Sequence, residues 1–478
     1  MKKFASSINS FFKIEERGST ITKEVLGGLT IFLAMVYVLP VNAGMLSATG
    51  MNFGAVFAAT AIAAAVASLM MGLFANYPIG LASGMGVNAF FTYTVVFGLG
   101  FSWQEALAAV LVSGVLFLII SLTGLRKRVI NAIPKNLKIA VGAGIGFFIA
   151  FIGFKNGGII VFDPDGTYVT LGVLSNPTVL LALFGIILVL VLHSLKLKIS
   201  KFAIIIAIMT TGLLGVLLGL IFPDLAVHMP SFASDNTGLL SSLGLTFGQA
   251  FKALPSLLAN PVSYAVIFTF LFIDFFDTTG TLVAVGHDAG LLNKDGELIN
   301  GEKALVADAT GTIVGAILGT STVTSYVEST TGIKQGARTG LSAVVVGVLF
   351  LVALLFYPLF SFVGSIPVSF GTTFLGTFYN VSIFVSPATS LALVYVGTLM
   401  VGQLREIDWK DDVAVTTTFI VIIIMMLAFS IAEGIAFGFI IYVILMLASK
   451  RHKEVDPVMY VLAGLFVIYY ILKFTVLM

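Results

Sequence analysis

Long, almost uncharged stretches of apolar residues recur along the whole sequence, and they constrain this chain more than any other feature. A helix needs about 20 mostly apolar residues to cross the hydrocarbon core of a bilayer. Measured against that length, the 478 residues predict seven spans, a polar-leaning segment, and seven further spans. The predicted spans cover residues 25–45, 53–74, 83–99, 105–124, 139–154, 177–192, 203–221, 261–285, 304–318, 320–333, 339–357, 386–402, 413–430 and 433–448.

The composition agrees with a membrane class. Hydrophobic residues make up 58% of the chain and charged residues only 10%, whereas soluble domains carry roughly 25% charged residues. The apolarity is continuous within each stretch, which excludes the alternating strands of an outer-membrane barrel. We therefore expect an all-α integral membrane protein of about 14 transmembrane segments, located in the plasma or inner membrane.

The lysine and arginine residues predict the orientation. If the N-terminal segment 1–24 is cytoplasmic, 22 of the 25 Lys and Arg residues fall on the cytoplasmic side of the predicted spans. Only Lys155 and Lys252 fall outside, and Lys473 is unassigned. This distribution follows the positive-inside rule and supports an even number of spans up to residue 448. The first 23 residues are polar and basic, and no cleavable signal peptide is expected.

The spans divide into two halves of equal size. The first half covers 25–221 and the second 261–448, joined by an extracytoplasmic linker at 222–260. Because each half holds an odd number of spans, the halves must be inverted relative to each other if they are related, as in many transporters. The C-terminal segment 449–478 contains one more apolar stretch, residues 456–478, which either crosses the membrane or lies at its interface.

The third and tenth spans carry the signs of interrupted helices. They read GLASGMGVNAFFTYTVVFGLG (80–100) and GAILGTSTVTSYVESTTGIKQG (315–336), rich in glycine first and in polar and β-branched residues afterwards. We expect a short extended piece in each. Unpaired backbone at membrane depth is tolerated only where it lines a cavity or binds a ligand, so these two spans are where a binding site is expected.

Carboxylates inside the predicted spans are the strongest functional signal. Asp274 and Asp277 lie three residues apart in one span, on one helix face, and Thr278 extends the polar character. Each charge near the bilayer centre costs roughly 2.5–3.5 kcal/mol on insertion scales, and such residues usually mark a pathway or a site. Glu328 lies in the interrupted tenth span, and an extended backbone would place it on one face with Tyr326. A helix-packing role is the alternative for these acids.

Three further residues are weaker candidates. Asn88 follows the glycines of the third span, where its amide can donate and accept hydrogen bonds, although it can equally bond to a neighbouring helix. Phe90 offers a ring on which a planar ligand could stack. Asp308 lies in the ninth span, where a network or gating role is as plausible as contact with a ligand.

Several function classes find no support in the residues. There is no cysteine, and the four histidines lie outside the predicted spans and are not spaced as a metal site. No metal and no cofactor are expected. Nucleophile and phosphate-loop motifs are absent, and the two aspartates of one helix cannot form an aspartyl dyad. We therefore expect a transporter for a small polar molecule, and not an enzyme or a nucleic-acid-binding protein.

The sequence is similar to AzgA-like purine permeases of the nucleobase–ascorbate transporter superfamily, which share the uracil-permease fold. The similarity extends over nearly the whole chain. The stretches that carry it are GMGVNAFFTY (84–93), FIDFFDTTGTLVAVG (272–286), GEKALVADATGT (301–312), STVTSYVESTTGI (321–333) and IAEGIAFGF (431–439).

The resemblance implies a fold and a site. It implies two inverted repeats of seven spans, a core domain of spans 1–4 and 8–11, and a gate domain of spans 5–7 and 12–14. Asp274 and Glu328 would then hydrogen-bond the purine, Asp277 would support binding or proton coupling together with Asp308, and Asn88 would shape the site from the other repeat.

The resemblance also assigns Tyr326 and Val327 to side-chain packing and backbone bonds beside the substrate. Departures from the family pattern at Phe90, Thr92 and residues 385–397 put the specificity in question more than the function. The sequence predicts import of hypoxanthine, guanine or adenine by proton symport with alternating access, and a homodimer is an open expectation. A uracil or xanthine permease, an anion exchanger of the same fold, and sodium coupling are the alternatives.

Overall fold

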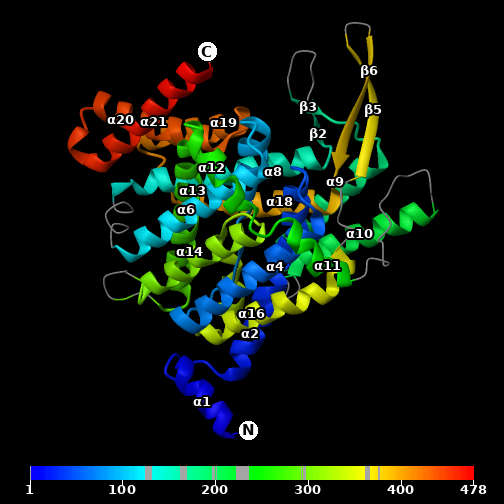
Figure 1. Cartoon of the computed structure of the whole chain (residues 1–478), viewed down its shortest axis with the longest axis vertical. Coiled ribbons are helices and arrows are strands. Elements are labelled where there is room, and N and C mark those ends of the chain that lie inside the picture. Colours follow the sequence, from blue (N-terminus) through cyan, green and yellow to red (C-terminus); the bar gives the residue numbers. More distant parts are fainter. Residues whose placement is uncertain are drawn as a thin grey trace.

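The computed structural model describes residues 2–123, 132–161, 169–195, 200, 202–221, 236–291, 293, 298–360, 366–374 and 377–477. Helices dominate these residues (Figure 1). The elements up to residue 221 are α1 (Lys2–Phe12), α2 (Ile21–Met35), α3 (Val38–Ser47), α4 (Phe53–Met70), η1 (Met71–Ala75), β1 (Leu81–Ser83), α5 (Met85–Ala89), η2 (Phe90–Gly98), α6 (Trp103–Leu122), α8 (Lys135–Asn156), β2 (Ile160–Val161), β3 (Thr170–Leu171), α9 (Pro177–Ser194) and α10 (Ala203–Ile221).

The remaining elements begin at residue 236. They are α11 (Asn236–Ser242), η4 (Leu243–Leu245), α12 (Gln249–Ala259), α13 (Val262–Asp288), α14 (Gly301–Leu318), β4 (Val323–Ser325), η5 (Val327–Ser329), α15 (Thr330–Ile333), α16 (Gly340–Ala353), η6 (Leu354–Phe356), α17 (Tyr357–Phe360), β5 (Ile366–Phe374), β6 (Thr377–Val385), α18 (Pro387–Val401), η8 (Gly402–Glu406), α19 (Asp412–Leu427), α20 (Ile431–Ala448), η9 (His452–Glu454) and α21 (Pro457–Leu477).

Eight stretches within the described residues are long and apolar enough to cross a membrane. Four shorter apolar helices accompany them, at Met85–Gly98, Gly340–Phe356, Asp412–Leu427 and Pro457–Ile468. The chain is therefore a mostly helical, multi-pass membrane protein. The count of 14 segments and the inverted relation of the two halves stay predictions.

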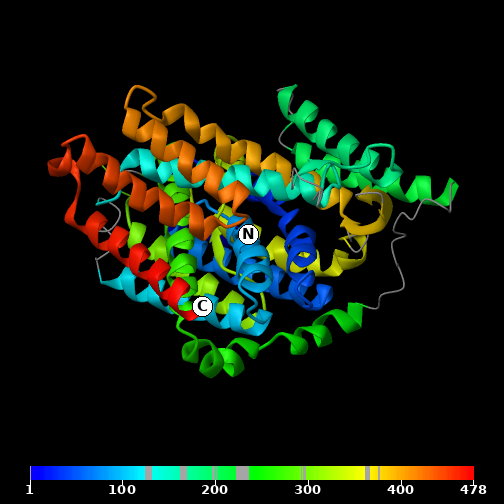
Figure 2. The ribbon, with the colours of Figure 1, turned by 90° about the horizontal axis from the view of Figure 1, so that it is seen from above.

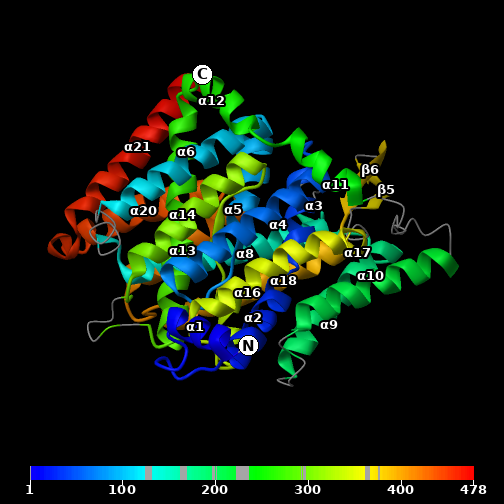
Figure 3. The same cartoon turned by 60° about the horizontal axis from the view of Figure 1, so that its bottom comes forward.

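The helices pack as two groups. In the first, α4 packs against α14 and α16, while α2 packs against α16 and α6 against α14. In the second, α8 packs against α18 and α19, α18 against α9 and α10, and α19 against α20. Figure 3 shows α2, α16, α4 and α14 side by side, and Figure 2 shows α9 and α10 at one edge of the molecule.

Helix starts follow rules that are readable in the sequence. Ser102 forms a capping box with Glu105 at the start of α6, and the Asn176 side chain accepts from backbone N–H groups of α9, whose first residue is Pro177. Ser430 caps α20 in the same way. Each cap satisfies a donor that the first turn of a helix leaves unpaired.

Two strands pair in the middle of the first group. Strand β1 runs antiparallel to β4, with Leu81 opposite Ser325 and Ser83 opposite Val323, and all six strand residues are buried. The pairing continues beyond the strands, because Gly84 N donates to Thr322 O (3.0 Å) and Tyr326 N donates to Gly80 O (3.1 Å). The expected extended pieces in the third and tenth spans are thus present, and they pair with each other.

The expected extent of the second extended piece is wrong. Strand β4 ends at Ser325, and Val327–Ser329 forms a 3₁₀ turn that leads into α15. Tyr326 and Glu328 therefore do not share one face of a strand. The turn satisfies backbone groups locally as soon as the partner strand ends, which the sequence pattern did not reveal.

Two segments between predicted spans contain secondary structure of their own. The described part of the 222–260 linker contains α11 and α12, and α12 packs against α6 with Ala250, Ala253 and Leu257 buried. Residues 366–385 contain the antiparallel strands β5 and β6, with Ile366 opposite Val385. Their β-branched and aromatic residues favour strands, and the pair projects from the helical body in Figure 1.

Glycines allow the closest helix contact in the first group. A Cβ atom on Gly340 would lie 2.0 Å from the carbonyl oxygen of Gly72. Small residues at such contacts let two backbones approach where larger side chains would separate them. Hydrogen bonds also hold the start of α2 against the start of α16. The buried Glu24 carboxylate accepts from the backbone N–H of Arg338 (2.7 Å) and of Thr339 (3.3 Å).

We expect Gly340→Ala to destabilise the protein, because the added methyl group collides with backbone that cannot rotate away. Overpacking of this kind typically costs about 1–3 kcal/mol. The matched control is Gly464→Ala in α21, where an added Cβ meets nothing within 4 Å. Thermal unfolding of the detergent-solubilised variants measures the difference, and equal midpoints for the two variants would contradict the close-contact interpretation.

A candidate binding site beside the paired strands

A cavity of about 570 Å³ lies against the paired strands. Its walls come from Tyr37 just after α2, residues 84–86 at the start of α5, one face of α13, and residues 324–331 of the tenth span. Helices α9 and α18 close it from the second packing group, through His193 and Tyr395. The cavity therefore lies between the two groups of helices.

Two carboxylates line this cavity. Asp277 reaches it from α13 and Glu328 from the 3₁₀ turn after β4. The Tyr37 hydroxyl donates to Glu328 Oε1 at 2.9 Å, which orients that carboxylate. Neither acid forms an ion pair with any residue that the structure describes, although Lys334 lines the same cavity. Acceptor groups without a neutralising cation suit a ligand that donates N–H groups.

The side chain of Tyr326, which follows β4, connects the two strands. Its hydroxyl donates to the carbonyl oxygen of Ser83 at the end of β1. Val327 also lines the cavity and is 44% exposed. Both residues line the cavity, and Tyr326 also stabilises the strand pair. Their assignment to substrate binding stays a prediction.

Two more carboxylates lie behind the cavity wall. Asp274 is 1% exposed and Asp308 is 0% exposed, and neither lines the cavity. Asp308 accepts from Thr278 Oγ1 (2.9 Å) and Ser325 Oγ (3.1 Å). Thr278 is also 2.8 Å from the Thr324 hydroxyl, so the network reaches strand β4.

The Thr312 hydroxyl joins Asp274 to the strand. It lies 3.0 Å from Asp274 Oδ2 and 3.0 Å from Val323 O, and it accepts from Val323 N at 3.1 Å. A hydroxyl has a single hydrogen, so it can donate to only one of these two acceptors at a time. The other carboxylate oxygen of Asp274, Oδ1, is buried without a partner among the described residues.

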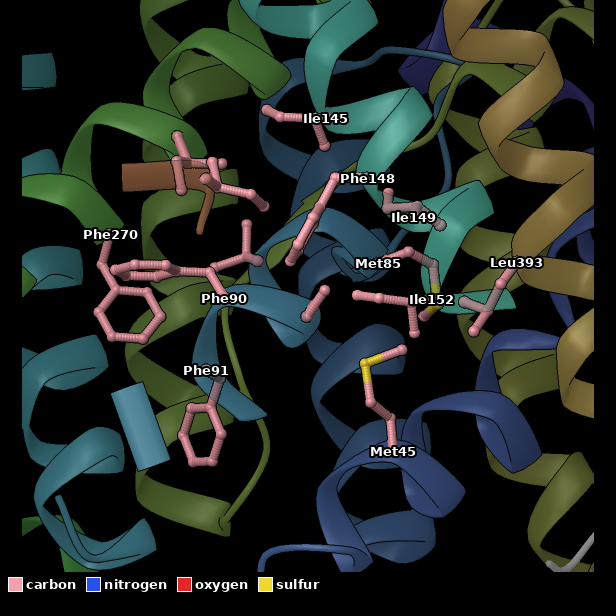
Figure 4. Close-up of a cluster of buried hydrophobic side chains, with 14 of the residues drawn as sticks. Met45, Met85, Phe90, Phe91, Ile145, Phe148, Ile149, Ile152, Phe270 and Leu393 are labelled. Carbon is pink, nitrogen blue, oxygen red and sulfur yellow. The ribbon is translucent and has the colours of Figure 1, made fainter. Parts of the chain in front are cut away.

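The two candidates from the third span lie off the cavity. Asn88 is fully buried and accepts from Ser83 Oγ (2.9 Å), while its Nδ2 has no partner in the described part of the chain. The Phe90 ring makes an edge contact with Phe270, with centroids 4.8 Å apart. Figure 4 shows Phe90 within a cluster of apolar side chains that includes Phe148 of α8. Phe90 therefore packs the core here, and Asn88 supports the end of β1.

Sequence reasoning missed several cavity residues. Tyr37 and Tyr395 are each the single tyrosine of a predicted apolar span, and no local pattern marks them. His193 was expected outside the spans, but it lies in the last turn of α9, where its Nδ1 is 3.2 Å from the Tyr395 hydroxyl. Their roles come from packing between helices that are distant in the sequence.

Several known proteins are similar to this chain over nearly its whole length. A family model described as "Permease family" matches residues 22–378. A guanine/hypoxanthine permease, PbuG, of Bacillus subtilis is 43% identical over 473 residues, covering 97% of this chain and 99% of that protein. The adenine permease AdeQ of Escherichia coli is 37% identical over 98% of this chain and 97% of its own length.

The chain belongs to this permease family. It is an AzgA-like member of the nucleobase–ascorbate transporter superfamily, as the resemblance of its motifs indicated, and it is a transporter rather than an enzyme.

Two solved transporter structures have a fold similar to that of this chain. The transmembrane domain of the cyanobacterial bicarbonate transporter BicA matches with a TM-score of 0.56 at 16% identity, over 86% of this chain and 97% of that one. Murine Slc26a9, an anion transporter in an inward-facing state, matches with a TM-score of 0.57 at 9% identity, over 93% and 72% of the two chains. At these identities the likeness concerns the fold alone.

We expect Thr312→Val to destabilise the protein, because it leaves both backbone groups of Val323 and one oxygen of Asp274 without their shared partner. A buried polar group that loses its partner costs about 1–3 kcal/mol. Thr310→Val is the matched control on the same helix, since the Thr310 hydroxyl bonds only to Val306 O of its own helix. Thermal unfolding midpoints report the effect, and the hypothesis fails if Thr310→Val is the more damaging change.

Proposed function

We propose that this protein imports purine nucleobases, hypoxanthine and guanine or adenine, by proton symport. The observation that carries the proposal is that Asp277 and Glu328 line one cavity beside the paired strands and form no ion pair with a described residue. Purine N–H groups are donors that such acceptors fit. The curated relatives that are similar over almost the whole chain are named guanine/hypoxanthine and adenine permeases.

The geometry favours a division of labour among the four acids. Glu328, oriented by Tyr37, and Asp277 face the cavity and are the proposed purine ligands. This exchanges the roles first expected for Asp274 and Asp277, because Asp274 is turned towards Thr312 on α14. Tyr37 and Tyr395 offer rings beside the proposed base-binding site.

Asp274 and Asp308 are the proposed proton carriers. Both are buried, on the helices α13 and α14, which pack against each other, and two negative charges close together in a region of low dielectric repel each other strongly. A proton on Asp274 would also relieve the competition for the single hydrogen of Thr312, because the carboxyl could then donate to that hydroxyl. Through Thr278, Thr324 and Ser325 the protonation state would be felt at the strand that borders the purine.

The position of the cavity between the two packing groups supports the proposal of alternating access. The first group corresponds to the core domain and the second to the gate domain that the resemblance implied. Lys334 and Gln403 line the cavity beside basic segments expected on the cytoplasmic side, which supports an inward-open state. Relative movement of the groups would then expose the site to the other side.

An anion exchanger of the same fold is the second candidate, because both solved neighbours are named for bicarbonate or anion transport. Their identities to this chain are 16% and 9%, and carboxylates facing the cavity disfavour an anionic substrate. A permease for uracil or xanthine differs only in the base that the same acceptors would hold.

We expect Glu328→Gln to abolish accumulation of radiolabelled hypoxanthine, because an amide places an N–H donor where the purine also donates. The matched control, Glu302→Gln, changes an exposed acid in the first turn of α14 and should leave uptake unchanged. Competition by unlabelled guanine, adenine, xanthine and uracil identifies the preferred base. Wild-type accumulation by the Glu328 variant would refute the site assignment.

We expect Asp308→Asn to separate binding from coupling. In proteoliposomes with an imposed pH gradient, this variant should lose gradient-driven accumulation while purine counterflow, which needs no net proton movement, persists. Affinity should change by less than about tenfold, or ~1.4 kcal/mol. Accumulation by the wild type that ignores a protonophore and requires sodium would exclude proton symport.

A further inference from the structure

A second cavity, of about 740 Å³, lies apart from the candidate site and shares no lining residue with it. We call it the lateral groove. It is lined by residues 93–99 of η2, residues 261–269 at the start of α13, residues 428–433 between α19 and α20, and part of α21. Lys155, at the end of α8, also lines it. The basic segments expected in the cytoplasm adjoin the opposite ends of these helices.

The lateral groove opens through exposed apolar side chains. Phe97, Tyr264, Leu465 and Ile468 line it and are 49–60% exposed. In a chain that spans a membrane, exposed apolar side chains at this depth face lipid rather than water. Deeper in the groove lie Phe268 and Phe466, whose ring centroids are 5.7 Å apart in an edge contact. The shape and surface of the groove therefore fit a hydrocarbon chain.

One cation lies in this apolar surface. The Lys155 ammonium is 4.7 Å from the ring centroid of Phe429 and 5.6 Å from that of Tyr93. It forms no ion pair with any residue that the structure describes. An ammonium group has three donors, so the two ring faces leave a donor for an oxygen ligand. The Tyr93 hydroxyl is fixed in turn by Asn156, at 3.3 Å.

The other polar groups of the groove leave this cation available. The carboxylate of Glu433 accepts from the Tyr470 hydroxyl. The Thr94 hydroxyl is buried, lines the groove and has no partner in the described part of the chain. The Thr94 hydroxyl and the Lys155 ammonium together can bind an anionic oxygen, while the carboxylate that also lines the groove, that of Glu433, is engaged by the Tyr470 hydroxyl. A purine would need an acceptor that Glu433 already uses for that bond.

We propose that the lateral groove binds one phospholipid, with its phosphate on Lys155 and one acyl chain between α13 and α21. The groove is bounded by η2 and α13, which both pack against α6 of the first packing group, and by α8 and the α19–α20 turn from the second. A lipid here connects the two groups at the side remote from the candidate site. If the groups move as proposed above, the lipid modulates the transport rate; the binding itself does not depend on that movement.

The test uses the full-length protein, purified in detergent and titrated with dioleoylphosphatidylglycerol. Native mass spectrometry counts the bound lipid. Lys155→Gln should weaken the tightest-bound lipid by at least about tenfold, because it removes the charge–phosphate contact. Ala265→Phe should do the same by filling the groove while the charge stays. The matched control, Lys252→Gln, alters an exposed lysine of α12 and should retain the lipid.

Thermal unfolding of each variant verifies that it is folded. Equal lipid retention in wild type, Lys155→Gln and Ala265→Phe overturns the proposal, as does equal loss in Lys252→Gln, which indicates a non-specific lipid shell. Displacement of the lipid by hypoxanthine, with Lys155→Gln abolishing that competition, overturns it in favour of an outer purine site. Normal lipid binding in a protein that transports no purine would leave this proposal standing and remove only the proposed function.

Discussion

The pairing of β1 with β4 is the interaction on which the rest of the structure depends. Two helices that stop inside a membrane expose N–H and C=O groups that hydrocarbon cannot satisfy, at a cost of several kcal/mol for each group. Here each interrupted span supplies the partner for the other, over residues 81–83 and 323–325. The pairing joins segments about 240 positions apart. It also leaves the turns that follow the strands beside a cavity.

The carboxylates depend on that arrangement. None of Asp274, Asp277, Asp308 and Glu328 forms an ion pair with a described residue. Hydroxyl groups of Thr278, Thr312, Ser325 and Tyr37 compensate in part. Buried charge with incomplete compensation is unfavourable for stability, and its retention indicates a function in binding or in moving charge. Thr324 and Ser325 of β4 line the cavity and connect to Asp308, through Thr278 or directly, so a change at Asp308 reaches the cavity wall through few bonds.

The lateral groove and the candidate site lie at different positions along α13 and share no lining residue. One combines carboxylates, tyrosines and strand ends; the other combines exposed apolar side chains and a single ammonium. Each is bounded by both packing groups. In a transporter whose groups move, interactions at either place affect the same equilibrium, because a ligand that contacts both groups favours the arrangement to which it binds.

The sequence by itself determined the membrane class, most of the long helices, the two interrupted spans and the acids worth testing, because hydropathy, glycine clusters and buried charge are local signals. Tertiary structure decided the rest. Asp274 and Asp277 lie three residues apart on one helix, yet only Asp277 reaches the cavity, because Thr312 of another helix holds Asp274. Tyr37, His193 and Tyr395 carry no local signature and reach the site only through packing. Glu328 lies on a 3₁₀ turn and not on a strand, because β4 ends where its partner does. Contacts between segments that are distant in the sequence decide which side chains lie together. The periodicity of one segment carries no information about those contacts.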